Sequence, residues 1–172
     1  MRIAALPVLI LAVLLAGCAG TPDGIEPVRG FEVQRYLGTW YEVARLDHPF
    51  ERGLERITAR YELRADGGLR VVNRGYDVDR GEWREAEGKA YFTGSPDVAS
   101  LKVSFFGPFY GGYNVIALDG DGYQWALVCG PSRDYLWILS RQPGLAPEVL
   151  GRLQELASRL GFETSRLIFV EH

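Results

Sequence analysis

Residues 57–75, ITARYELRADGGLRVVNRG, decide the fold, because two alternating stretches stand on either side of a turn. In each stretch, arginine or glutamate occupies one face and mostly apolar residues occupy the other. The mostly apolar face consists of Ile57, Ala59, Tyr61, Leu63, Leu69, Val71 and Asn73. An Asp-Gly pair lies between the stretches, which is typical of a tight turn between antiparallel strands. The pattern predicts a β-hairpin with one face buried and the other in water.

The same alternation recurs along most of the chain and predicts an all-β fold. Eight segments are expected as strands, at residues 40–46, 57–64, 69–75, 85–92, 100–106, 112–119, 122–129 and 134–141. Short connections between successive strands imply an antiparallel up-and-down meander. Eight such strands can close into a β-barrel whose interior holds a small ligand.

One helix is predicted after the strands, in the sequence APEVLGRLQELASRLGF at residues 146–162. A proline opens it and a glycine closes it, as helix ends prefer. Val149, Leu153, Leu156 and Leu160 recur at helical spacing, so one face is apolar. We expect this face to pack outside the barrel on Leu136 and Ile138, and a final short strand, RLIFV, to follow.

The N-terminus has the features of a targeting segment. Residues 1–17 combine one arginine with a short apolar run, as secretory signals do. The sequence Leu-Ala-Gly-Cys that ends at Cys18 resembles the lipobox of bacterial lipoproteins, which implies cleavage before Cys18 and lipidation of it. The alternative is an ordinary signal peptide. We expect a lipidated cysteine and a flexible Gly/Pro tether at residues 18–30, and the folded domain at residues 31–172.

Composition excludes several kinds of protein. The net charge of −3 is too small to indicate a polyanion partner such as a nucleic acid. Once Cys18 carries lipid, Cys129 has no partner for an intramolecular disulfide. The two histidines, His48 and His172, cannot form a clustered metal site by themselves, so no metal or other cofactor is expected.

Catalytic motifs are nearly absent, and we expect no enzyme. The chain has no G-x-S-x-G elbow and no glycine loop that runs from a strand into a helix. Cys129 is the one candidate nucleophile, and a lone cysteine in a strand is usually buried and inert. Two alternatives stay open: a lipid-modifying enzyme that uses Cys129, and a structural envelope protein whose barrel is filled by side chains.

The start of the first strand, Gly38-Thr39-Trp40, resembles the lipocalin family when taken with the meander and the late helix. The likeness runs from about residue 31 to the end. CGPSRDYLWILSRQP, at residues 129–143, resembles the last-strand motif of bacterial lipocalins and of the apolipoprotein D-like branch. The lipobox points to the outer-membrane lipoproteins of the family. The resemblance implies that Arg141 covers Trp40 at the closed end of the barrel, beside Gly38.

The resemblance also implies a ligand cavity. Tyr61, Asn73, Phe105 and Trp137 match cavity-lining positions of the family, and strand alternation adds Leu63, Val71, Val103, Tyr113, Ala59, Ala90 and Leu101. An apolar and aromatic lining with a few hydroxyl or amide groups is typical of a pocket for an amphipathic ligand. The family and the membrane address favour a fatty acid or a lysophospholipid; the alternative is a dry core.

The charged residues near the first loop include three arginines close to the mouth and one glutamate that is expected to face inward. Arg45, Arg52 and Arg56 are expected near the mouth, where they meet an anionic head group or simply face water. Strand alternation places Glu42 inward and Arg45 on the opposite face. A buried carboxylate must be paired or hydrogen-bonded, and Arg141 is the partner we expect for Glu42.

An aromatic hairpin tip, FFGPFYGGY, spans residues 105–113. It favours either membrane contact or a homodimer, and the alternative is a loop tucked against the domain. Together these observations predict a lipid-binding barrel that is lipid-anchored to the bacterial outer membrane and faces the periplasm.

Overall fold

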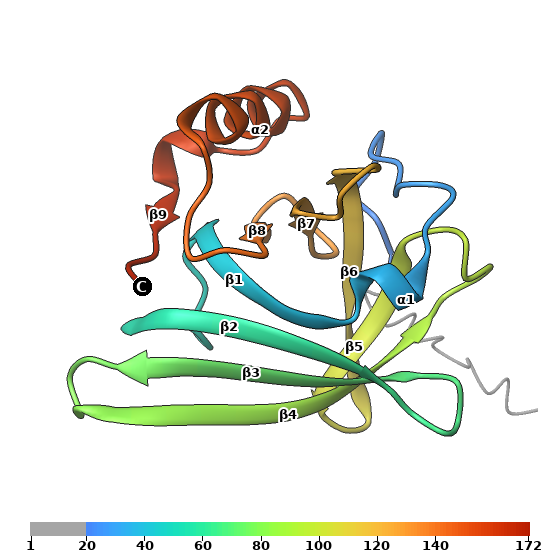
Figure 1. Cartoon of the computed structure of the whole chain (residues 1–172), viewed down its shortest axis with the longest axis horizontal. Helices are drawn as coiled ribbons and strands as arrows, with labels where there is room; N and C mark the ends of the chain where they lie inside the picture. The colour runs from blue at the N-terminus through green and yellow to red at the C-terminus, as the bar shows by residue number, and fades with distance from the viewer. Residues whose placement is uncertain (1–19) are drawn as a thin grey trace, which may run out of the picture.

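The computed structural model describes residues 20–172 and shows a closed antiparallel barrel, as expected (Figure 1). Its strands are β1 (Gly38–Arg45), β2 (Leu54–Leu63), β3 (Leu69–Asp77), β4 (Glu82–Phe92), β5 (Ser100–Phe106), β6 (Phe109–Leu118), β7 (Trp125–Cys129) and β8 (Leu136–Ser140). Each strand pairs with the next, and β1 closes the barrel by pairing with both β8 and β2. The short elements α1 (Val33–Tyr36), η1 (Thr164–Arg166) and β9 (Ile168–Phe169) complete the fold with α2 (Pro147–Arg159).

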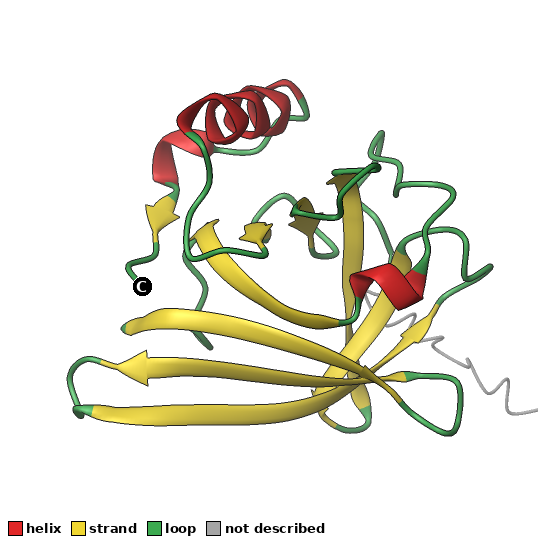
Figure 2. Ribbon diagram, viewed as in Figure 1, coloured by secondary structure: helices red, strands yellow, loops and turns green. Residues whose placement is uncertain are grey.

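The barrel has a closed end and a mouth. The chain passes through α1 into β1 at the closed end, so the loop between β1 and β2 and the turn between β5 and β6 both lie at the mouth. Strands β2, β3 and β4 form the longest ribbon of the sheet, as Figure 2 shows. The first part of β4, which begins at the mouth, extends past β5, because β4 pairs with β5 only at Lys89–Phe92.

Helix α2 packs on the outside of the barrel, where the sequence placed it. Leu136 and Ile138 are fully buried beneath it, together with Leu153 and Ala157 of the helix. The apolar residues therefore form two cores, one inside the barrel and one between the barrel and α2. The expected terminal strand is β9, which pairs with β1.

A bulge in β1 changes which residues face the interior. Glu42 pairs with Leu139 and Ala44 pairs with Ile138, so Val43 is an extra residue on the β1 side. Beyond the bulge, Ala44 belongs to the core beneath α2, and Arg45 is only 3% exposed and bonds to Glu42. The expectation that Arg45 lies opposite Glu42 is therefore wrong, because strict alternation fails at an inserted residue.

Residues 20–30 lie against the barrel. The Val28 amide donates to the carbonyl of Val115 at 2.9 Å, and the Ala99 amide donates to the carbonyl of Val28 at the same distance. Ile25 is buried in the core beneath α2. This part of the expected flexible tether is therefore held in place by main-chain bonds and an apolar anchor. The signal segment and Cys18 lie outside the described residues.

Within the described residues, no helix is long and apolar enough to cross a membrane.

Candidate functional site

The closed end of the barrel is sealed by Trp40. Its side chain is fully buried, and the indole Nε1 donates to the Tyr36 carbonyl at 2.8 Å. The guanidinium carbon of Arg141 lies 3.9 Å from the Trp40 ring centroid, which is close enough for a cation–π contact. Arg141 also donates to three main-chain carbonyls, those of Arg35, Thr39 and Tyr123. These bonds fix the guanidinium over the indole and tie three chain segments into one floor.

Gly38 allows the backbone conformation with which the chain enters the floor. Its φ of +93° lies in the region that residues with a side chain rarely adopt. A Cβ there would still have room, since its nearest atom would be Arg141 Nη1 at 3.5 Å. Backbone conformation, rather than space, therefore calls for glycine where the chain turns from α1 into β1.

The interior wall contains most of the residues expected to line a cavity. Tyr61 and Val71 are buried in the inner core, together with Ala90 and Leu101. The others are only partly buried and pack against that core or complete the wall: Ala59, Asn73, Val103, Phe105, Tyr113 and Trp137. These side chains come from several strands and keep some exposure, so the wall above the floor is not fully packed by its own residues.

Leu63 does not belong to this wall. It is 48% exposed and is the last residue of β2. The pairing of β1 with β2 ends where Gly38 meets Tyr61, so Leu63 lies beyond the floor of the barrel. The expectation was wrong because strand alternation continues into the hairpin after the barrel has closed.

Three tyrosine hydroxyls meet near the floor. Tyr61 donates to the Tyr113 oxygen at 2.8 Å, and the Tyr36 and Tyr113 oxygens are 2.7 Å apart. Burial raises the pKa of each hydroxyl above its ordinary value, so all three are neutral at physiological pH. Three protons serve two hydrogen bonds, which leaves one O–H able to donate to another group.

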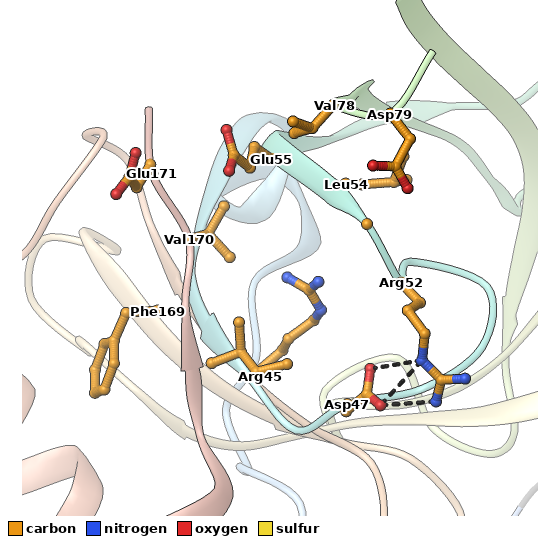
Figure 3. A pocket seen from close by; sticks show the side chains of 12 residues that line it. Arg45, Asp47, Arg52, Leu54, Glu55, Val78, Asp79, Phe169, Val170 and Glu171 are labelled. Atoms are coloured by element: carbon orange, nitrogen blue, oxygen red, sulfur yellow. Dashed lines mark hydrogen bonds and ion pairs between the residues drawn. The ribbon is translucent and has the colours of Figure 1, made fainter. Parts of the chain in front are cut away.

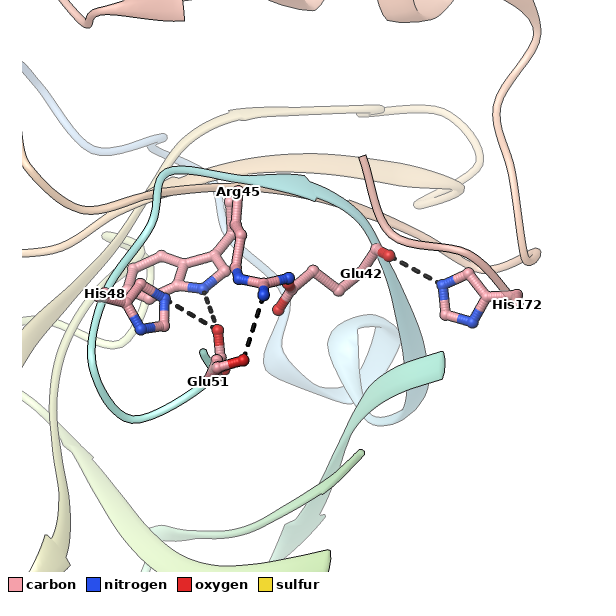
Figure 4. Close-up of polar contacts among 6 residues, drawn as sticks. Glu42, Arg45, His48, Glu51 and His172 are labelled. Atoms are coloured by element: carbon pink, nitrogen blue, oxygen red, sulfur yellow. Dashed lines mark hydrogen bonds and ion pairs between the residues drawn. The ribbon is translucent and has the colours of Figure 1, made fainter. Parts of the chain in front are cut away.

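A buried charged cluster of Glu42, Arg45, His48 and Glu51 lies toward the mouth (Figure 4). Arg45 donates to Glu42 Oε1 and to the Glu51 carbonyl, each at 3.1 Å. Glu51 Oε2 lies 2.8 Å from His48 Nε2 and accepts from Trp137 Nε1 at 3.1 Å. Glu51 thus ties the first loop to the barrel wall.

Arg45, and not the expected Arg141, is the partner of Glu42. The bulge in β1 brings the two side chains to the same face, which strict alternation did not allow. Desolvation, reinforced by the nearby Glu51, raises the pKa of the Glu42 carboxyl well above its usual value, and Arg45 opposes this effect. The Glu42 carbonyl also lies 2.8 Å from His172 Nε2.

The other two arginines of this region are on the surface. Arg52 forms an ion pair with Asp47 at 2.7 Å, and Arg56 lies over the ring of Tyr76. A surface cleft of about 350 Å³ opens beside Arg52, between β2 and the C-terminal segment (Figure 3). Carboxylates and apolar side chains line it in mixture: Asp47, Glu55, Asp79, Glu171, Leu54, Val78, Phe169 and Val170. Arg45, which donates to Glu42, also borders this cleft.

Cys129 lies in the wrong place for catalysis. It is fully buried in the core beneath α2, on the outer face of β7. Burial raises the pKa of its thiol to about 12, so the reactive thiolate is scarce at neutral pH. Among residues 20–172, no group of histidine, cysteine, aspartate and glutamate side chains could hold a metal ion.

Known proteins agree with this architecture. A family model described as a lipocalin-like domain matches residues 31–172. The chain is 60% identical to outer membrane lipoprotein Blc of Escherichia coli K12, over 93% of this chain and 91% of that protein. It is 53% identical to the lipoprotein of the same name from Vibrio cholerae, over 95% of each chain.

A solved structure carries the same fold. Insecticyanin from the tobacco hornworm Manduca sexta superposes with a TM-score of 0.69 at 21% identity, over 90% of this chain and 87% of that one. With the sealed floor, the partly exposed inner wall and the bacterial relatives taken together, this chain belongs to the lipocalin family, in its branch of outer-membrane lipoproteins.

Proposed function

We propose that this protein binds an amphipathic lipid, either a fatty acid or a lysophospholipid, and stores or transports it in the cell envelope. Lipocalins bind small hydrophobic ligands, and this barrel combines a sealed floor with an accessible aromatic wall. The observation that supports the proposal most is the partial exposure of inward-facing side chains above a fully buried Trp40. A barrel filled by its own side chains would bury them.

The polar groups of the interior suit one end of such a ligand. In the proposed complex, the acyl chain lies against Val103, Phe105 and Trp137, where apolar contact is available. The head group lies toward the mouth, near the charged cluster around Arg45 and Glu51. The anchor at Cys18 holds the barrel at the membrane that supplies its ligand.

Fluorescence quenching by a lysophospholipid with a brominated acyl chain tests the proposal. Of the four tryptophans, Trp137 lines the interior, Trp40 is fully buried in the floor, Trp83 is 45% exposed and Trp125 packs under α2. We expect saturable quenching with one ligand per barrel, and we expect Trp137→Phe to remove most of it. The matched control Trp83→Phe should leave it unchanged.

Equal quenching in both variants, or none in the native protein, would contradict the proposal. A brominated fatty acid run in parallel identifies which head group is preferred. The enzyme alternative loses its nucleophile with Cys129 buried, and a filled barrel would bind neither probe.

A further inference from the structure

A pocket lies on the outer surface of the barrel, at the point where β1 and β2 stop pairing. The last pair between these strands is formed by Tyr41 and Thr58. Both side chains face outward, because their neighbours Trp40 and Ala59 face the inner core. The pocket has a volume of about 310 Å³, and its other lining residues are Arg56, Arg74, Trp83, Pro143 and His172. This volume is at the lower end of the range for small-molecule sites.

The two arginines of this outer pocket have no carboxylate partner among residues 20–172. Other arginines of β2, β3 and β4 form ion pairs, namely Arg60, Arg70 and Arg84. Arg74 forms none, although Glu85 lies directly opposite it in the sheet. No aspartate or glutamate lines the pocket. The pocket therefore brings together two positive charges that the described part of the chain leaves uncompensated.

Aromatic rings support both guanidinium groups. The guanidinium carbon of Arg74 lies 4.0 Å from the centroid of the Trp83 ring, and that of Arg56 lies 5.3 Å from the centroid of the Tyr76 ring. The rings of Tyr76 and Trp83 contact each other edge to face, with centroids 5.5 Å apart. A guanidinium that lies over a ring can keep its N–H edge free for a bidentate bond to a carboxylate or a phosphate. Both arginines are thus held in a form that suits an anion.

A bulge directs the side chain of Arg56. The pairing of β2 with β3 shifts register between Glu55 and Thr58, and Arg56 has a φ of +52° within this bulge. The Arg56 amide donates to the carbonyl of Glu171 at 2.8 Å, which holds the main chain in this conformation. Bulges re-aim the side chains that they contain. Here the re-aimed guanidinium borders the same pocket as Arg74.

His172 closes the other side of the pocket. Its ring contacts that of Tyr41 edge to face, with centroids 5.3 Å apart. His172 Nε2 lies 2.8 Å from the Glu42 carbonyl (Figure 4). A carbonyl oxygen only accepts, so Nε2 carries a proton and Nδ1 is the ring nitrogen left for another partner. The imidazole is therefore fixed in place and keeps one nitrogen available.

Trp83 offers an exposed ring beside these charges, since its side chain is 45% exposed. The tip of the β5–β6 hairpin has more exposed rings, with Phe106 at 81% and Phe109 at 78%, so the alternative of a loop tucked against the domain is wrong. Neither phenylalanine lines the outer pocket, whereas Trp83 does. A flat group attached to a bound anion can stack on this indole.

We propose that the outer pocket binds a small phosphate monoester that carries a flat aromatic group. Arg56 and Arg74 bind the phosphate oxygens, and their two charges match a phosphate that carries about two negative charges at neutral pH. The aromatic group of the ligand lies against Trp83. Because the pocket is on the outside of the barrel, this binding activity is separate from the proposed binding of lipid in the interior.

Isothermal titration calorimetry of the full chain with phenyl phosphate tests the proposal. We expect saturable binding of one probe per chain. Arg74→Gln should raise Kd about ten-fold, because charge-assisted hydrogen bonds to the phosphate are lost. Trp83→Ala should also weaken binding, and inorganic phosphate should bind more weakly than phenyl phosphate, since each lacks one partner of the stacking contact. Circular dichroism of each variant checks that the fold is retained.

Arg60→Gln is the matched control. Arg60 lies on the same outer face of β2, next to the strand pair that ends the pocket, but it is paired with Glu62 and does not line the pocket. Its replacement removes the same charge from the same surface and should leave Kd within about two-fold, since exposed charges outside a binding site are largely screened.

Four results would overturn the proposal. One is the absence of saturable binding in the native protein, and another is an equal loss of affinity in Arg60→Gln and Arg74→Gln, which would indicate general surface charge. The others are equal affinities for phenyl phosphate and inorganic phosphate, and native affinity in Trp83→Ala. Quenching by the brominated lysophospholipid should be the same in Arg74→Gln as in the native protein, because Arg74 faces outward. The outer pocket and the interior are therefore tested independently.

Discussion

Replacing Trp40 by alanine should be the most damaging single truncation in the barrel floor. The side chain is fully buried, and truncation of such a residue costs about 3–5 kcal/mol. The change also removes the stacking surface of Arg141, worth about 0.5–2 kcal/mol, and the donor to the Tyr36 carbonyl. These losses place the expected cost near the upper end, at about 4–5 kcal/mol of unfolding free energy.

Urea denaturation followed by far-ultraviolet circular dichroism measures this loss of unfolding free energy, and a thermal melt of the same variant measures the change in Tm. For a domain of this size, each kcal/mol lowers Tm by about 2–4 °C, so we expect a decrease of roughly 8–20 °C. The control is Trp83→Ala, since Trp83 is half exposed and its ring contacts the guanidinium of Arg74. That change should cost no more than about 1 kcal/mol. Equal losses for the two variants would refute the account of the floor, and ligand preference should be unchanged in Trp40→Ala.

Other predictions concern the buried charges, the thiol and the anchor. Arg45→Met leaves Glu42 buried without its cation and should cost about 3–5 kcal/mol in urea titrations; a loss under about 1 kcal/mol would contradict the pairing. The pKa of Glu42 is raised in the folded state, so its contribution to stability is full below the unfolded pKa and falls as pH rises through the folded pKa. Stability measured from pH 4 upward should therefore decline less steeply in Glu42→Gln than in the native protein, and parallel profiles would contradict this. Native Cys129 should resist a thiol-specific reagent at pH 8 and react on unfolding; rapid native labelling would contradict its burial. Cys18→Ala should release the protein from the membrane fraction, and retention there would contradict lipid anchoring.

The barrel and its floor could be predicted from the sequence because their signals are periodic or local. Alternation in residues 57–75 is set by one buried face, and β2 and β3 form the expected hairpin. The contact between Trp40 and Arg141 was implied by the resemblance to the lipocalins, and it agrees with two strand ends that meet at the closed end. The apolar stripe of α2 likewise indicated its position over Leu136 and Ile138.

The places where the strand alternation is interrupted could not be predicted from the sequence. Nothing in YEVAR marks Val43 as an inserted residue, so the pairing of Glu42 with Arg45 was missed. Alternation also gives no sign of where the barrel ends, which is why Leu63 was placed inside.

Loops and the N-terminal segment carry weaker signals still. His48 and Glu51 complete the charged cluster from a loop, and no spacing rule brings them to Trp137. Within residues 20–30, Ile25 and Val28 were the only hint that this polar segment packs on the barrel.

Lipid extraction of the protein purified from its native envelope tests the central claim most directly. Mass spectrometry of the non-covalent extract should find about one acyl-chain lipid per barrel, and delipidated protein should take up one lysophospholipid or fatty acid in native spectra. Absence of lipid from the extract, together with no uptake by the delipidated protein, would contradict the account of this barrel as a lipid carrier.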